Sequence, residues 1–472
     1  MHPPRAAATR TRPRWPAPLA GLAALALYAR TLAPGLTWAH HAADGGDLLA
    51  AALTAGVPHP SGYPTYQLLL RVVIAIFPGE PARAGNWLSA LCAAAAVALF
   101  ADLAGRMLAQ ISTRAGVQAM SAVGTDENRT TETRRAQSHF RNLCATWAIP
   151  RTVPFSLSGW AALAAALTWA ASPIFWGQAV VTEVYALNAL SVVVLLWLLW
   201  GWWEAVDAGC RGRRWLIGAG AALGLGLGNH LTLLLLLPGA AVWLWAGRRA
   251  AGRTLARDVL AALGAAVLGL AVYAYLPLAA AAVPPVNWGD PRTPAQLWAL
   301  VSGEVYRGLV FGLPLAYLPA RLGAWSAEAL RQFGGPWGVI LALVGLWRLD
   351  RHLHAWWQAT LLIAAAYSVY AIGYNTPDSF VYLIPAGCVA ALWLAAGLDW
   401  LVENAAAAGR PVVFRADGHA GRGAAADENV AQAAGLSSRR SRQSGGLRYR
   451  AIFRAGDTGL SGFPPPASRS IL

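Results

Sequence analysis

Long apolar runs, separated by connections that carry arginine, constrain the fold of this sequence more than any other feature. Runs of about 20 apolar residues, the length needed to cross the hydrocarbon core of a bilayer, recur along most of the chain. Only 12% of the 472 residues are charged, whereas soluble domains have about a quarter. The sequence therefore predicts an all-α, polytopic helical membrane protein.

The positions of the arginines predict the topology. We expect a cytoplasmic N-terminus at residues 1–15 and a multi-pass membrane domain at residues 16–402 with about ten transmembrane helices, because every arginine-rich connection then falls on the cytoplasmic face. The expected crossings are residues 16–32, 87–108, 160–175, 186–203, two short helices that meet near Asn229 within 216–237, then 259–278, 337–347, 356–372 and 384–402. Both termini are then cytoplasmic, and the protein belongs in the cell membrane.

Four segments do not fit a simple crossing. Residues 63–77 are too interrupted, and suit a helix that lies at the membrane interface or re-enters it. Residues 110–155 form a polar cytoplasmic loop without apolar periodicity, which we expect to be largely disordered. Residues 284–335 are expected to be a long polar extracytoplasmic loop. Residues 403–472, rich in Ala, Gly, Ser and Arg, predict a disordered basic tail.

The basic residues are all arginine, 37 in number, and the formal net charge is +15. Because they lie between apolar spans and in the tail, they indicate topology and attraction to anionic lipid rather than nucleic-acid binding. The four cysteines, Cys92, Cys144, Cys210 and Cys388, do not have the spacing of metal ligands. We therefore expect membrane lipid but no nucleic acid as a partner, no disulfide framework and no zinc site.

Residues 38–66 concentrate polar groups directly after the first crossing, with the carboxylates of Asp44 and Asp47, three histidines and three prolines. Other unusual polar residues, from distant parts of the chain, are predicted on the same extracytoplasmic face. The full set is Asp44, Asp47, His59 and Tyr63; Glu183 and Tyr185; Asn229 and His230; Asn287, Trp288 and Asp290; Glu304, Tyr306 and Arg307; and Asn375, Asp378 and Tyr382. Ionisable residues near a bilayer are costly and usually functional, so these six clusters indicate the lining of one cavity.

Each cluster taken alone also has a structural explanation. Asp44 or Asp47 is equally suited to cap a helix that starts near Leu48. His230, beside a helix break, is suited to satisfy a freed backbone carbonyl. Residues 287–291 also fit a turn, and Arg307 fits an anchor at the membrane interface. The face that the clusters share is what favours a common site.

A carboxylate just outside the membrane, with His and Arg nearby, suits group transfer from a lipid-borne phosphate donor. The carboxylate takes a proton from an acceptor hydroxyl, and cationic or hydrogen-bonding groups stabilise the leaving phosphate. A transporter would place paired charges and broken helices near the midplane, within two related halves. The sequence has one broken helix and no internal repeat, but a non-catalytic transporter or binder of a lipid-linked substrate remains an alternative. A structural or assembly protein, in which the motifs are folding signals, is the third.

The motifs DGGD, GVPHPSGYPTY, FWGQAVVTEVYALN, GLGNHLT, YLPLAAAAVPPVNWGDP and NTPDSFVYLIP, in this order, carry a resemblance to a known family. The chain resembles, over residues 28–401, bacterial membrane proteins long classed as a domain of unknown function. That family shares its domain with an animal transmembrane protein O-mannosyltransferase, and is similar to the GT-C glycosyltransferases. Three differences stand out: Asp44-Gly45-Gly46-Asp47 replaces the family's Asp-Ser-Gly-Glu, Ala279 replaces an arginine, and the tail lacks the helical repeats of many relatives.

The resemblance implies an inverting, GT-C-like glycosyltransferase that uses a sugar linked to polyprenyl phosphate, with a protein or glycan as acceptor. Asp44 is then the general base, and Asp47 orients it or the acceptor. His59, His230 and Arg307 are candidates to contact the phosphate, and Glu183, Trp288 and Asp378 to contact sugar or acceptor. Further expected substrate contacts are Tyr63, Tyr185, Asn229, Asn287, Asp290 and Tyr306. A divalent metal is compatible with this chemistry, although no ligand spacing argues for one.

Overall fold

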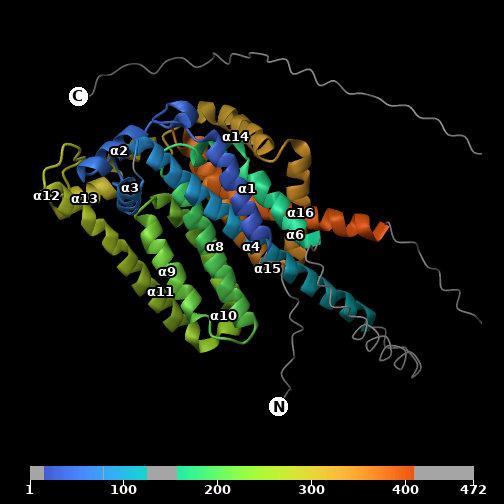
Figure 1. The fold of residues 1–472 in the computed structure, drawn as a ribbon. Coiled ribbons are helices and arrows are strands. Elements are labelled where there is room, and N and C mark those ends of the chain that lie inside the picture. Colours follow the sequence, from blue (N-terminus) through green and yellow to red (C-terminus); the bar gives the residue numbers. More distant parts are fainter. Residues whose placement is uncertain (1–14, 78, 125–156, 409–472) are drawn as a thin grey trace, which may run out of the picture. The chain divides into compact units, whose positions relative to one another are not determined.

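The computed structural model describes residues 15–77, 79–124 and 157–408, and Figure 1 shows their arrangement. The chain divides into two units, residues 1–411 and 412–472, and every described residue belongs to the first. The described part is helical, as the sequence predicts, and an isolated β-bridge is its one element of strand pairing. The predicted disorder of the tail falls outside the described residues, except that the last helix continues to Ala408.

Prolines, whose fixed φ suits the first helical position, begin four of the eight α-helices described in the first half of the chain. They are α1 (Pro16–Thr31), α2 (Gly45–Thr54), α3 (Pro64–Ile76), α4 (Pro81–Gly124), α6 (Leu157–Ala170), α7 (Pro173–Ala179), α8 (Tyr185–Asp207) and α9 (Arg213–Leu227). The second half contains α10 (Leu237–Ala251), α11 (Leu255–Leu270), α12 (Tyr275–Ala281), α13 (Pro294–Val301), α14 (Leu318–Gln332), α15 (Pro336–Gly373) and α16 (Ile384–Ala408). Short 3-10 turns join several of them, among them η2 (Leu231–Leu236), η5 (Glu304–Leu309) and η7 (Ser379–Leu383).

Several of these helices are long and apolar enough to cross a membrane. Within the described residues there are five such segments, or six if α6 and α7, bent by 69° at their junction, form one span. The five are Pro81–Gly116, Tyr185–Asp207, Leu231–Ala281, Pro336–Gly373 and Ser379–Ala406. The chain is thus a multi-pass membrane protein by the length and composition of its helices, whereas the expected number of ten crossings stays a prediction.

Helix α4 is longer than the predicted crossing at residues 87–108. It continues to Gly124, so the first part of the segment expected to be disordered is helical, and residues 125–155 lie outside the described part. The extension is held by contacts: the Arg114 guanidinium donates to the His352 carbonyl oxygen at 3.2 Å and lies over the Trp203 ring. The local polarity of the sequence did not reveal these long-range partners.

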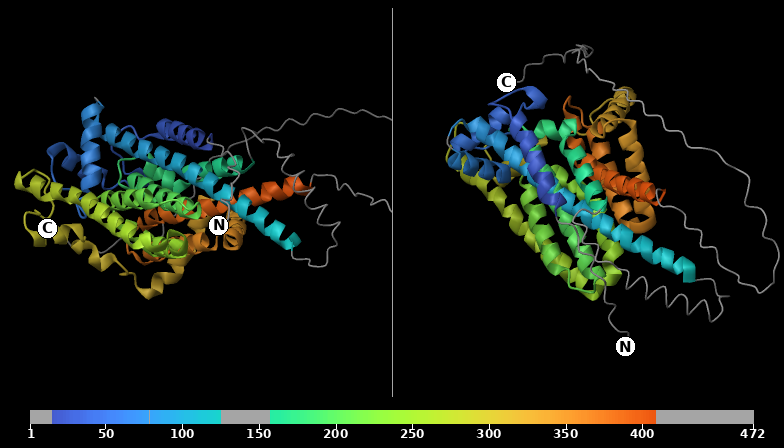
Figure 2. Two further views of the ribbon diagram at one scale, coloured as in Figure 1. Left: turned by 90° about the horizontal axis from the view of Figure 1, so that it is seen from below. Right: turned by 45° about the vertical axis from the view of Figure 1, so that its right-hand side comes forward.

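The broken apolar run near Asn229 behaves as the sequence predicts. Helix α9 ends at Leu227, and α10 begins at Leu237 after the turn η2. Helix α9 packs closely against α11, and the two lie side by side in Figures 1 and 2. Gly220 and Gly224 face carbonyl oxygens of α11 at distances that leave no room for a Cβ. Small residues permit such close backbone approach between apolar helices.

Helix α15 contains both of the crossings predicted at residues 337–347 and 356–372, joined at a non-helical residue, Leu353. Gly345 and Thr360 would be about 22 Å apart on a straight helix. Yet Gly345 packs on the Trp393 carbonyl oxygen, and the Trp393 indole donates to the Thr360 hydroxyl at 3.0 Å. Both halves of α15 therefore lie alongside α16, and the chain reverses direction at Leu353.

The segment predicted as a polar loop at residues 284–335 is itself largely helical. It contains α13, η5 and α14. The Arg321 guanidinium of α14 donates to the Ser379 hydroxyl at the start of η7, at 2.6 Å, and to the Thr376 carbonyl oxygen just before it, at 2.9 Å. The segment is thus anchored to the end of the helical unit that carries the candidate site.

Candidate active site

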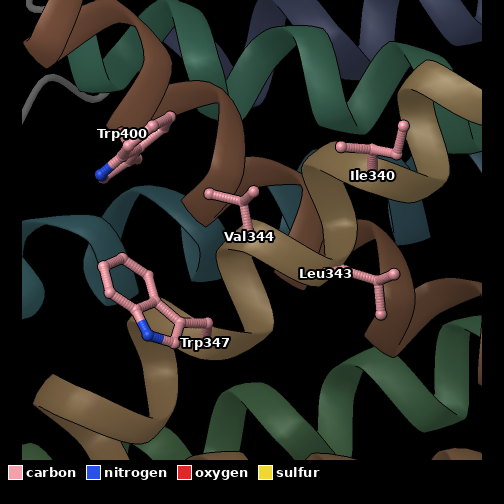
Figure 3. Close-up of a pocket in the computed structure, with 5 residues that line it drawn as sticks. All are labelled: Ile340, Leu343, Val344, Trp347 and Trp400. Carbon is pink, nitrogen blue, oxygen red and sulfur yellow. The ribbon is translucent and has the colours of Figure 1, made fainter.

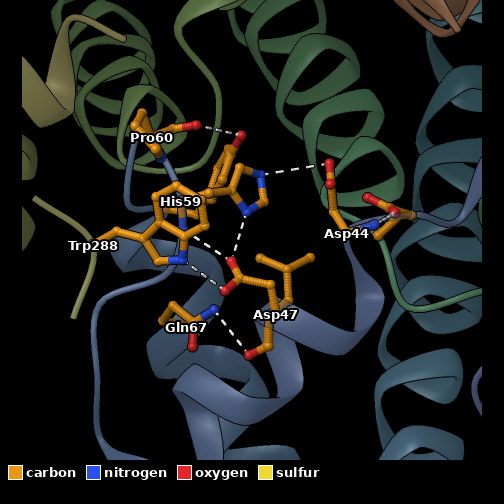
Figure 4. Close-up of polar contacts among 9 residues, drawn as sticks. Asp44, Asp47, His59, Pro60, Gln67 and Trp288 are labelled. Carbon is orange, nitrogen blue, oxygen red and sulfur yellow. Dashed lines mark hydrogen bonds and ion pairs between the residues drawn. The ribbon is translucent and has the colours of Figure 1, made fainter. Parts of the chain in front are cut away.

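The two carboxylates of the DGGD motif lie at the start of α2. Asp44 occupies the position before the helix and Asp47 lies in its first turn. The Asp44 side chain makes no capping hydrogen bond to the helix. Helix capping therefore does not explain the presence of Asp44 at this position. Both carboxylates instead face the imidazole of His59 (Figure 4).

His59 lies between the two carboxylates. Its Nδ1 is 2.7 Å from Oδ2 of Asp47, and its Nε2 is 3.5 Å from Oδ2 of Asp44. The same Asp47 oxygen also accepts the backbone N–H of His59 at 2.9 Å. Main chain and ring of His59 are therefore fixed by one carboxylate, while the far side of the ring faces the other.

A distant segment completes the surroundings of Asp47. The Trp288 indole N–H donates to Oδ1 of Asp47 at 2.9 Å. A parallel bridge holds Trp288 there, because the Val57 N–H donates to the Val286 carbonyl oxygen and the Trp288 N–H donates to the Val57 carbonyl oxygen. The turn that carries His59 and the segment that carries Trp288 are thus joined through their backbones.

The two carboxylates differ in what surrounds them. Both oxygens of Asp47 accept hydrogen bonds, and its side chain is 25% exposed. The side chain of Asp44 is 47% exposed, and its one ion-pair or hydrogen-bond partner among the described residues is Nε2 of His59. The Asp44 carboxylate is therefore accessible to an incoming group, whereas both oxygens of Asp47 are occupied by hydrogen bonds from His59 and Trp288.

We call Asp44, Asp47 and His59 the acidic trio, and the contacts among them shift the pKa of His59 and of Asp47. Burial lowers the pKa of His59, but hydrogen bonds and charges of Asp44 and Asp47 outweigh it and raise the value to about 9. Burial raises the pKa of Asp47, but its hydrogen bonds with His59 outweigh that effect and the net shift is downward. Both shifts favour an ion pair between the His59 imidazolium and the Asp47 carboxylate.

Glu183 lies behind Asp44 and is 1% exposed. Its Oε1 accepts the backbone N–H of Asp44 at 3.2 Å, and its Oε2 is buried. Burial, above all, and the charge of Asp44 raise the pKa of Glu183 to about 8. Asn229, also buried, donates to the adjacent Val184 carbonyl oxygen at 3.2 Å, so the helix break supports the same loop.

Aromatic rings adjoin the acidic trio. Tyr63 contacts His59, with ring centroids 5.0 Å apart, and His230 on its other side at 6.4 Å. His230 in turn lies 5.6 Å from Tyr185 and 5.8 Å from Tyr382. We call these four residues beyond His59 (Tyr63, His230, Tyr185 and Tyr382) the aromatic cluster. Its members come from four separate segments of the chain, which the sequence places on one face and the fold brings into contact.

The other predicted residues lie around this centre. Burial raises the pKa of Tyr306 to about 12, and the nearby charges of Asp44 and Asp47 contribute. Asp378 directly precedes η7. Burial raises the pKa of Tyr374, and the nearby charges of Asp378 and Asp44 raise it further.

Four predicted residues have partners of their own. Asn287 donates to Asp290 at 2.8 Å, and Asp290 also pairs with Arg292 at 2.7 Å. Arg307 is exposed and pairs with Glu304 at 3.4 Å, so its contacts do not include the acidic trio.

The sequence did not reveal the role of Gln67. This residue is fully buried in α3, and its side-chain amide donates to the Leu48 carbonyl oxygen at 3.1 Å, which ties α3 to α2 (Figure 4). The signal was present, because Gln67 carries a side-chain amide inside a largely apolar helix, PTYQLLLRVVIAI. Such a residue in a hydrophobic helix needs a partner.

Two other features do not add chemistry to the site. In the described ranges, no group of three or more His, Cys, Asp or Glu side chains is arranged to hold a metal ion. A separate hollow between α15 and α16 is lined by apolar side chains (Figure 3), namely Ile340, Leu343, Val344, Trp347 and Trp400. It contains no acid, base or nucleophile.

Fold and site together define a multi-pass helical membrane protein with a paired-carboxylate centre at the end of its helices. Residues 44–252 match the family model described as the protein O-mannosyl-transferase TMEM260 N-terminal domain. The match begins at Asp44 and includes Asp47, His59 and Glu183, but it ends before Trp288. No curated protein matches the chain, and no solved structure does.

Proposed function

We propose that this chain is a membrane glycosyltransferase that moves a sugar from a polyprenyl-phosphate donor to an acceptor hydroxyl on the extracytoplasmic face. The match to a protein O-mannosyl-transferase domain supports a glycosyltransferase role and a protein hydroxyl as acceptor. The apolar helices support a donor that resides in the membrane. The observation that carries the proposal is the contrast between an open Asp44 and a fully bonded Asp47.

In the proposed reaction, Asp44 is the general base. The acceptor oxygen attacks the anomeric carbon of the sugar, and its proton passes to the Asp44 carboxylate. The bond between that carbon and the phosphate oxygen breaks, and polyprenyl phosphate leaves with the bonding electrons. A single displacement of this kind inverts the configuration at the sugar carbon, and base catalysis by a positioned carboxylate contributes about 10²–10⁴ in rate.

The residues around Asp44 have supporting roles in this proposal. Asp47 holds the His59 cation next to Asp44, and this positive charge lies between the two carboxylates. The positive charge of His59 favours a leaving phosphate near Asp44, whereas Arg307, paired with Glu304, has no contact with the trio. The aromatic cluster offers apolar faces with polar edges, a surface that suits the mixed faces of a sugar ring.

The experiment uses purified protein in lipid, incubated with a panel of polyprenyl-phosphate sugars and peptides or glycans with free hydroxyls. Release of polyprenyl phosphate is measured for the wild type and for Asp44→Asn. We expect release with at least one donor, and a loss of about 10²–10⁴ in rate in the variant.

Asp350→Asn is the matched control. Asp350 is 45% exposed and pairs with His354 at 2.6 Å, much as Asp44 faces His59, but it lies in α15 next to the reversal at Leu353. We expect this variant to keep the wild-type rate. Full activity in Asp44→Asn, or no release by the wild type across the panel, contradicts the proposal.

A further inference from the structure

The backbone of Asp44 is held by a segment that lies far along the chain. Its N–H donates to Oε1 of Glu183, a residue 139 positions away. Gly45, the next residue, packs against the Thr182 carbonyl oxygen so closely that a Cβ would lie 2.9 Å from it. The start of α2 therefore rests directly on residues 182–183.

These supporting residues are themselves firmly fixed. The Thr182 hydroxyl bonds to Asn86 Oδ1 at 2.7 Å, and the Ser89 hydroxyl donates to the Glu183 carbonyl oxygen at 3.3 Å, so α4 holds the loop from one side. Asn229 donates to the Val184 carbonyl oxygen from the other side. The side chain of Glu183 thus projects toward Asp44 from a backbone that several elements immobilise.

Glu183 is nearly completely buried, and one of its carboxyl oxygens accepts the Asp44 N–H. In this arrangement it is shielded from a substrate that enters at the exposed Asp44 carboxylate. With its pKa raised to about 8 by burial, it is mainly neutral at pH 7. A neutral acid accepts the Asp44 N–H without adding negative charge behind the base.

We propose that Glu183 is a positioning residue for Asp44: its carboxyl oxygen fixes the backbone of Asp44 and thereby the direction in which the base meets the acceptor hydroxyl. The inference rests on the proposed function of Asp44 as the base. It differs from a substrate contact, because Glu183 acts through Asp44. Misplacement of a catalytic group by about 1 Å costs up to about 10²-fold in rate.

The test compares Glu183→Gln with Glu183→Met, two uncharged side chains of similar size. The glutamine oxygen is able to accept the Asp44 N–H, whereas the methionine sulfur is a weak acceptor. Rates of polyprenyl phosphate release at increasing donor concentration give kcat and KM. A second readout needs no donor: the rate at which a carbodiimide and a neutral amine label Asp44, measured by peptide mass.

We expect Glu183→Gln to keep kcat and the labelling rate within about threefold of the wild type. We expect Glu183→Met to lower kcat by about tenfold to a hundredfold, with donor KM within about twofold, and to change the labelling rate at least about threefold. Asp258→Met is the control, because Asp258 is another buried acid, in the first turn of α11. It should behave as the wild type in both assays.

Three results overturn the inference: an unchanged kcat in Glu183→Met, an equal loss in Glu183→Gln, or a raised KM at constant kcat, which indicates substrate contact. If Glu183→Met does not fold, Ser89→Ala takes its place, since it removes a hydrogen bond to the Glu183 backbone. We expect a kcat loss of about threefold there, and no change overturns the inference. If the wild type turns over no donor, the proposed function fails, while the labelling comparison still decides whether Glu183 positions Asp44.

Discussion

The two ends of the helical unit use charged groups in different ways. At one end, His59 bridges two carboxylates, and Asp44 remains half exposed with one partner. At the other, Arg348 is buried and donates to the Ala396 carbonyl oxygen, Asp399 and Glu403. Helix α8 separates the two ends by about 33 Å from Tyr185 to Asp207.

This difference distinguishes charge that holds the fold from charge that is available for chemistry. We call Arg348, Asp399 and Glu403 the Arg348 network. Its hydrogen bonds join α15 to α16. In the acidic trio, Asp47 joins separate segments through its hydrogen bonds to His59 and Trp288, whereas the Asp44 carboxylate remains accessible. Substitutions at the first end should therefore change stability, and at the second end, activity.

The largest expected effect on stability is that of Arg348→Met. It leaves Asp399, which is fully buried, without its cation, and removing one partner of a buried ion pair costs about 3–5 kcal/mol. Thermal or denaturant unfolding in lipid or detergent measures the loss. Arg351→Met is the control, because Arg351 lies exposed over the Trp347 ring, and should cost under about 1 kcal/mol. Equal losses of stability in the two variants would contradict the structural role that we assign to the Arg348 network.

Asp47→Asn should lower turnover by about tenfold to a hundredfold, less than Asp44→Asn. The amide weakens the hydrogen bonds that orient His59 beside Asp44, and bonds to a charged group contribute about 1.5–3 kcal/mol. Rates of polyprenyl phosphate release for the two variants test the order. A greater loss in Asp47→Asn than in Asp44→Asn would exchange the roles that we assign to the two carboxylates.

The His59 cation makes the stability of the site dependent on pH. Its pKa in the folded protein is about 9, above the value near 6.5 of an unfolded chain. Its contribution is therefore complete below pH about 6.5 and is lost as the pH rises through about 9. We expect a loss on the order of 1–2 kcal/mol between pH 7 and 10, reduced from the full shift because Asp44 is half exposed.

Unfolding midpoints across this pH range, for wild type and His59→Gln, test that expectation. The variant should lack the alkaline loss. His354→Gln, at the exposed pair with Asp350, should retain it. If His59→Gln shows the same loss as the wild type, the bridging cation is not its source.

The smallest expected effect is that of Trp288→Phe. The ring remains available to pack near His59, but the N–H that donates to Asp47 is removed. Because Trp288 is 47% exposed, water replaces part of the lost bond, and turnover should fall about threefold to tenfold. Trp298→Phe, at an exposed tryptophan of α13, should stay within about twofold. An equal loss of turnover in the two variants would contradict a role of the Trp288 N–H in the site.

Local signals in the sequence predicted much of the architecture. The glycines before Asn229 predicted the helix break, and the spacing of Asp44 and Asp47 predicted two acids at the start of a helix. Each of these features depends on residues within a few positions of one another. For the same reason the sequence also identified the segments that form the site.

Features that depend on distant partners were beyond the sequence. The extension of α4 is held by Arg114 against the His352 carbonyl oxygen, 238 positions away. The bond from Trp288 to Asp47 spans 241 positions. The sequence predicted two crossings at residues 337–347 and 356–372, but not that both halves of α15 pack on α16. No local pattern encodes which pairs will meet.

The backbone bridge between Val57 and Asn287 has a consequence for biosynthesis. Trp288 is synthesised 241 residues after Asp47, which at about 5–20 residues per second is a delay of about 10–50 s. The two carboxylates and His59 are therefore made well before the indole that completes the hydrogen bonding of Asp47. A nascent chain that stops at residue 252, where the family match ends, has its acids and its imidazole but not this donor.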